Sequence, residues 1–140
     1  MSQNVGDIIF DKSLDDIDFE LCDTRIYQYY SVGTSYVGGR KSIRNFLYKE
    51  ISSPYFDSSF SGFLTIRFVV SCNGKTGRFR AKMVNIYLKE IEFRKDKIEF
   101  LINCLKSLND WNVGSSKGVA LNSYYQINFK INKGLILDIY

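Results

Sequence analysis

Four carboxylates between positions 90 and 99 are the residues best placed for acid–base chemistry: Glu90, Glu92, Asp96 and Glu99. Against a catalytic role, the chain of 140 residues contains no histidine. Histidine is the commonest general base, the partner of nucleophilic serine and cysteine, and a frequent metal ligand. Carboxylates near the start of a helix more often stabilise the helix dipole and keep the surface solvated. The sequence therefore favours a protein that is not an enzyme.

Three cysteines, Cys22, Cys72 and Cys104, are far apart and lack the C-x-x-C spacing of zinc or redox motifs. Cys104 lies on the apolar side of a predicted helix, where it is expected to fill the core. Cys72 lies at a predicted turn and is expected to be accessible. A disulfide would require an oxidising compartment, so the redox state of the three cysteines stays open. We predict no metal site and no cofactor.

The composition indicates one folded domain. Hydrophobic residues make up 45% of the chain and aromatic residues 16%, which is ample material for one core. A solvated surface accounts for the net charge of +4, so we predict neither a nucleic acid nor a small-molecule substrate as partner. No run of 18 apolar residues predicts a membrane-spanning helix. The first residues lack a signal sequence, so either the chain is cytoplasmic or a leader or anchor was removed.

Side-chain periodicity predicts the elements that position these groups. A period of two predicts strands over residues 63–70 and 78–87, joined by an Asn73-Gly74 turn. Apolar residues three and four positions apart predict helices over residues 40–51 and 95–108. A last alternating run predicts a strand over residues 119–131. This order predicts an α+β fold, a small antiparallel β-sheet with two α-helices packed on one face.

The flanking regions are expected to pack on this unit. The acidic residues 1–36 carry short apolar runs at 8–10 and 17–21, which predict two short strands. Residues 132–140 form an apolar tail that would pair with a sheet edge or with a partner. We expect Trp111 to cap the core and Gly114 to need backbone geometry that other residues resist. The strand over 119–131 is expected at a sheet edge, which can capture an extended peptide.

Residues 37–131 resemble the C-terminal domain of TonB, in the form common among Bacteroidetes energy transducers. The resemblance rests on the order and spacing of short pieces, none of them specific alone. In chain order these are Gly38-Gly39, then Ile43, Phe46 and Leu47, then Pro54, Ser61-Gly62, Leu64–Val70, Asn73-Gly74, Trp111–Gly114, Gly118-Val119 and Tyr125–Phe129.

The chain departs from the family pattern at three places. Val113 stands where the family usually has a proline, and Pro54 precedes Tyr55, whereas the family has tyrosine before proline. The second helix begins with basic residues at 94–97 instead of small and acidic ones. A proline-rich spacer and a membrane anchor are absent from the given sequence. These departures bear on energy coupling more than on the fold.

The resemblance implies a periplasmic, non-catalytic interaction domain. In the family, the last strand pairs with a short peptide segment of an outer-membrane transporter and passes on the pull of an inner-membrane motor. Carried over to this chain, the binding edge runs from Ser123 to Lys130. The outward contacts would be Tyr124, Gln126, Asn128 and Lys130. These residues could equally be ordinary solvent-facing strand residues.

Two other functions compete with this interpretation. The first is a structural or assembly module that uses the fold for homodimerisation, with residues 135–140 pairing between chains. The second is an enzyme, which would require a pocket that holds two of the four carboxylates with shifted pKa values.

Overall fold

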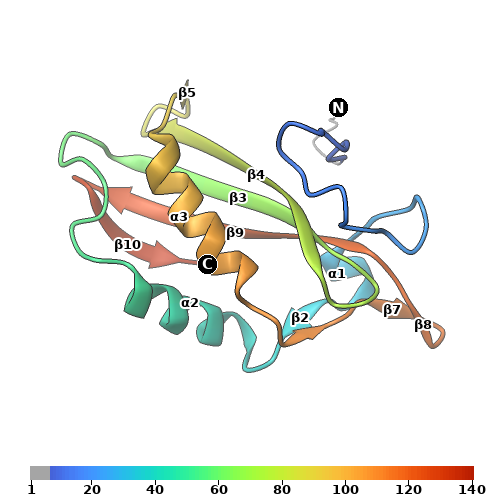
Figure 1. Ribbon diagram of the computed structural model, residues 1–140. Coiled ribbons are helices and arrows are strands. Elements are labelled where there is room, and N and C mark those ends of the chain that lie inside the picture. The colour runs from blue at the N-terminus through green and yellow to red at the C-terminus, as the bar shows by residue number, and fades with distance from the viewer. Residues whose placement is uncertain (1–6) are drawn as a thin grey trace.

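The computed structural model describes residues 7–140 and shows an α+β fold (Figure 1). A six-stranded sheet runs in the order β1-β9-β3-β4-β5, and β10 pairs with β9 on the same side as β1. The helices are α1 (Tyr29–Val32), α2 (Gly39–Glu50) and α3 (Lys95–Lys106). The strands are β1 (Tyr27–Gln28), β2 (Ser35–Tyr36), β3 (Gly62–Val70), β4 (Thr76–Asn85), β5 (Glu90–Ile91), β6 (Trp111–Asn112), β7 (Ser115–Ser116), β8 (Val119–Ala120), β9 (Ser123–Asn132) and β10 (Leu135–Ile139).

The hairpin of β3 and β4 confirms the two strands predicted around the Asn73-Gly74 turn. Alternate residues of β3 face the core, and Leu64, Ile66 and Phe68 are fully buried. The register shifts opposite Phe68, where β4 carries an extra residue. Arg78 has a positive φ of 54° at this bulge, which bends the start of β4.

Helices α2 and α3 confirm the predicted helices and cover one face of the sheet (Figure 1). The apolar stripe of α2 buries Ile43 and Leu47, and that of α3 buries Leu101 and Leu105. Each such side chain contributes about 1.5–3 kcal/mol on burial. Cys104 lies in the same core, as predicted, and its thiol is free.

Residues 7–21, here named the N-terminal strap, contain no strand, so the strands predicted at 8–10 and 17–21 are wrong. The strap inserts single apolar side chains into the sheet face that α2 and α3 leave open. Ile8 is 6% exposed and packs with Val69 and Tyr124. A disulfide between Cys22 and Cys72 ties the end of the strap to the β3–β4 turn. Residues 1–6 of the predicted N-terminal extension lie outside the described residues.

The prediction that β9 forms a sheet edge is wrong. Strand β3 pairs with β9 along one side, from Ser123 to Ile131. On the other side, β1 pairs in parallel with the first two residues of β9, and β10 pairs antiparallel with its last four. Strand β9 is therefore an interior strand over most of its length.

The predicted apolar tail is a strand of the sheet. Lys133 and Gly134 have φ values of 48° and 81°, as a two-residue hairpin turn requires, and this turn folds β10 back onto β9. Ile139 of β10 is 2% exposed and belongs to the main core. The outward N–H of Ile139 donates to the Asp138 carboxylate at 2.9 Å, so a charged side chain occupies the outer edge of β10 there.

Trp111 and Gly114 were both expected to serve the fold. Trp111 is 8% exposed and packs edge-on against Phe68, which confirms that it caps the core. We expected Gly114 to need backbone geometry that other residues resist, but its φ is not positive. A Cβ atom at this position would instead collide with Val32 and Thr34, so the absence of a side chain permits close packing.

Candidate functional site

The residues predicted to bind a peptide are only partly accessible. Ser123 is fully buried, with its hydroxyl against that of Thr34. Tyr124 is 3% exposed beneath the strap, where its hydroxyl accepts the Ile8 N–H at 3.0 Å. These two predicted contacts cannot reach a visiting strand without a local rearrangement.

The other predicted contacts lie further along β9. Asn128 exchanges two main-chain hydrogen bonds with Tyr140, which closes the outer side of the strand there. Lys130 is exposed and lies opposite Asp138 of β10. Gln126 lies between the parts of β9 that β1 and β10 cover, and the Arg40 guanidinium donates to its C=O at 3.0 Å. Even this gap in the edge is therefore occupied by a charged side chain.

The opposite side of the sheet offers a more open edge on β4. The main-chain N–H and C=O of Asn128 point away from β3, toward Tyr140. Because main-chain groups alternate in direction along each antiparallel strand, the register of β9, β3 and β4 means that the main-chain groups of Phe79 and Ala81 also point away from β3. Strand β5 covers β4 only at Met83 and Val84. Across residues 7–140, the Ala81 N–H and C=O have no partner in another strand or loop.

A cleft of about 800 Å³ lies beside this edge. The strap forms one wall, α3 forms the other, and the start of β4 lies between them. Phe79, Ile102 and Leu108 supply apolar surface, while Lys106 and Glu99 supply opposite charges. A groove with apolar and charged walls beside free main-chain groups is a geometry that suits an extended peptide.

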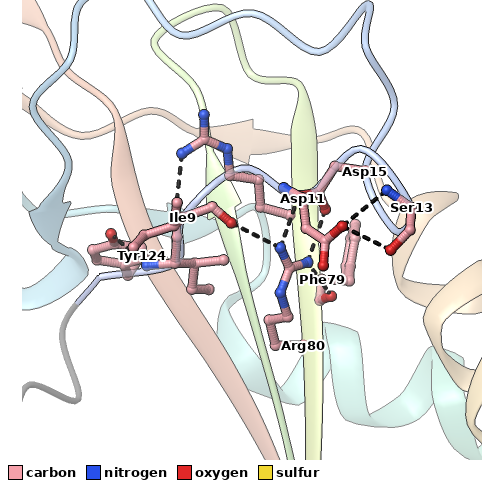
Figure 2. Close-up of polar contacts among 9 residues, drawn as sticks. Ile9, Asp11, Ser13, Asp15, Phe79, Arg80 and Tyr124 are labelled. Carbon is pink, nitrogen blue, oxygen red and sulfur yellow. Dashed lines mark hydrogen bonds and ion pairs between the residues drawn. The ribbon is translucent and has the colours of Figure 1, made fainter.

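The strap is held to the β4 edge by Arg80 (Figure 2). The Arg80 guanidinium donates two hydrogen bonds to the Asp15 carboxylate, at 2.8 and 2.7 Å, and a third to the C=O of Ile9 at 3.0 Å. It also donates to the outward C=O of Phe79 at 2.9 Å. One guanidinium thus fixes the strap and covers a main-chain acceptor of the open edge. The side chain of Asp15 is 1% exposed and that of Arg80 is 27% exposed, so water screens the pair only in part.

The ion pair sets a pH dependence for the strap. Hydrogen bonds from Arg80 hold the pKa of Asp15 below its ordinary value of 3.8, against the effect of burial. Because the folded-state pKa is the lower one, the stabilisation is fully present above about pH 4 and is lost as the pH falls through the folded-state value. We expect protonation of Asp15 to lower the protection of the Ile8 amide about tenfold, where protection is the exchange rate of an unfolded chain at the same pH divided by the observed rate. Hydrogen exchange between pH 5 and pH 2.5 measures this.

Asp15→Asn should remove that pH dependence. Asp96→Asn is the matched control, because Asp96 pairs with Arg94 at 2.8 Å on the open surface, with the two side chains 63% and 75% exposed. Equal acid sensitivity of Ile8 exchange in both variants would contradict the assignment to Asp15.

The four candidate catalytic carboxylates do not converge on one cavity. Glu99 lines the β4 cleft, whereas Glu92 lines a separate cavity of about 400 Å³ beside Tyr55. Burial raises the pKa of Tyr55 to about 12, and its hydroxyl donates to the Lys97 C=O at 2.7 Å. Among residues 7–140, no group of three potential ligands could hold a metal ion, and no helix is long and apolar enough to cross a membrane.

Sequence reasoning missed the strap and the β4 edge. Arg78, Arg80 and Lys82 lie on the face of β4 that points away from the core, and the strap covers Arg78 and Arg80 there. The acidic composition before residue 24 was the available signal, because it complements that basic face.

Comparison with protein-family models, with curated proteins and with solved structures finds no match to this chain.

Proposed function

We propose that the chain is a non-catalytic interaction domain that captures an extended peptide segment by strand addition at the outer edge of β4. The observation that carries the proposal is the cleft of about 800 Å³ that Phe79 lines, at an edge of β4 that continues to the outward main-chain groups of Ala81. The binding edge is thereby moved from β9, which its neighbours cover, to the opposite side of the sheet. No catalytic step is assigned.

The resemblance to the TonB C-terminal domain supplies the proposed partner and compartment. The partner would be a peptide segment of an outer-membrane transporter, and the domain would lie in the periplasm and couple inner-membrane energy to transport. The disulfide between Cys22 and Cys72 supports an oxidising compartment of this kind. The order of two helices and an antiparallel hairpin supports TonB-like packing around β3, β4 and β9.

The energetics suit a weak and reversible complex. Phe79 and Ala81 offer up to four outward main-chain groups, and each hydrogen bond is worth about 0.5–1.5 kcal/mol net. Arg80 must first release the Phe79 C=O, which offsets part of this gain. Side chains that enter the cleft against Phe79 and Ile102 would supply the remaining affinity and the selectivity.

A proline at Ala81 tests the edge directly. The probes are synthetic peptides that tile the periplasmic N-terminal segments of outer-membrane transporters, titrated to millimolar concentration and followed by amide chemical shifts. We expect shifts at Phe79 and Ala81, and at least a tenfold loss of affinity in Ala81→Pro, because proline lacks the N–H that the added strand needs. Ala81→Ser keeps that N–H and serves as the control. Shifts confined to β9, or equal affinity in both variants, would rule out binding at β4.

Homodimerisation is the second candidate function. Leu135 and Leu137 of β10 are 42% and 52% exposed, and Tyr140 is 46% exposed, so this edge presents an apolar row. Sedimentation of the same samples separates the two functions. A dimer that Leu137→Ser disrupts would favour assembly through β10, whereas a monomer that binds peptide favours the β4 site. Removing residues after 132 would be a poor test, because Ile139 belongs to the core.

A further inference from the structure

The strap and the surface beneath it have opposite charges. From Asp7 to Asp23 the chain carries seven acidic residues and one lysine. The sheet face below presents Arg67, whose guanidinium lies 4.8 Å from the ring centre of Tyr124, and Arg78 and Arg80. Exposed Lys82 extends the same face along β4. An acidic segment thus lies on a basic surface of its own domain.

The contacts of the strap are those that a bound peptide would make. Arg78 donates to the C=O of Ile8 at 3.1 Å, and Arg80 donates to the C=O of Ile9 at 3.0 Å. Two successive main-chain carbonyls are therefore recognised by two arginines. The Ile8 side chain fills an apolar site, and the Asp15 carboxylate takes a two-pronged contact from Arg80. Such paired hydrogen bonds are selective for a carboxylate.

The strap is attached in a way that permits release. Within the described residues, no main-chain hydrogen bond joins the strap to a strand of the sheet, and its own main-chain bonds span three or four residues. Three of its large apolar side chains, Ile9, Leu14 and Ile17, are 79%, 65% and 81% exposed. A segment with few buried contacts opens at low cost. The disulfide at Cys22 would keep it tethered after release.

We infer that the strap is an internal substitute for an acidic, extended segment of a partner protein, which displaces it and takes over Arg78 and Arg80. The inference rests on the proposed function in one respect, namely that the partner segment is extended. The Arg78 Nε is buried and has no acceptor among residues 7–140, so a partner can add a contact that the strap lacks. A partner carboxylate that draws Arg80 from the Phe79 C=O also opens the β4 edge.

A labelled peptide with the sequence of residues 7–20 tests the exchange. Added to the full chain, it competes with a tethered strap whose effective concentration is about millimolar, so the wild type should bind it weakly. Asp15→Asn loosens the strap and should raise the affinity about tenfold. Arg80→Gln should remove binding, and Asp96→Asn should behave as the wild type. The amide spectrum of each variant shows that the sheet is intact.

The outcomes separate this inference from the proposed function. Equal peptide affinity in the wild type and Asp15→Asn overturns the inference, as does tighter binding of a (dT)15 oligonucleotide than of the peptide. Association of Asp15→Asn into dimers that exchange straps would also overturn it, since the occupant would then be a second copy. Strap-peptide binding without any response to transporter peptides would support the inference and reject the proposed function. Transporter peptides that bind the wild type and Asp15→Asn with equal affinity would support the proposed function and reject the inference.

Discussion

Replacing Phe68 by alanine is expected to lower the free energy of unfolding by about 3–5 kcal/mol, the usual cost of removing a buried phenylalanine. Phe68 is fully buried at the centre of β3. Its ring stacks on Phe79 at 4.8 Å between centroids and meets the edge of Trp111 at 5.6 Å. The loss of these ring contacts leaves a cavity, because the sheet cannot collapse around it. Urea unfolding at pH 7 measures the change.

Phe68→Ala should also alter the β4 cleft, since Phe79 and Trp111 line it. Phe100→Ala is the matched control. This ring is 42% exposed on α3, and we expect its removal to cost less than about 1 kcal/mol. A similar loss of stability in the two variants would mean that the ring cluster around Phe68 does not form the centre of the core.

Loss of the disulfide is the second large effect that we expect. Cys22 and Cys72 are separated by 50 residues, and their Cα atoms are 6.1 Å apart. A cross-link that closes a loop of this length stabilises a folded chain by about 2–4 kcal/mol, mainly because it restricts the unfolded chain. Cys22→Ser should therefore lower the free energy of unfolding by that amount. Urea unfolding with and without dithiothreitol measures it.

The reductant provides the control for the cysteine prediction. Dithiothreitol should destabilise the wild type to the level of Cys22→Ser and leave that variant unchanged. The remaining thiol of Cys104 is buried on α3, where burial raises its pKa, so it should react slowly in the folded protein. A wild type that is equally stable with and without reductant would show that the cross-link does not constrain the chain in solution.

The sequence predicted the elements whose patterns are local and long. The alternation of β3 and the apolar stripes of α2 and α3 each span eight or more residues, so burial reinforces one period throughout. The place of β9 in the sheet could not be read in the same way, because alternation shows which face is buried and says nothing about lateral neighbours. The Lys133-Gly134 turn was a usable signal for β10, but the sequence analysis described residues 132–140 only as an apolar tail.

The candidate site was harder to predict than the fold. The contact of Asp15 with Arg80 joins residues 65 positions apart, and that of Ile8 with Tyr124 joins residues 116 positions apart. A strap without a helix or strand has no period to detect. The four outward contacts predicted on β9, from Tyr124 to Lys130, share one face, but the strap covers that face at Tyr124. The class of function, an interaction domain, stays a proposal.

Charged side chains on the borders of the sheet also act against fibre formation. Arg40 covers the Gln126 C=O, Arg80 covers the Phe79 C=O and Asp138 covers the Ile139 N–H. A neighbouring molecule that stacked against any of these positions would have to break a hydrogen bond made by a charged side chain and leave that charge poorly solvated. An open sheet edge can pair with the same edge of other molecules and lead to aggregation. At Phe79, where we propose that a partner strand binds, Arg80 still disfavours the stacking of identical chains.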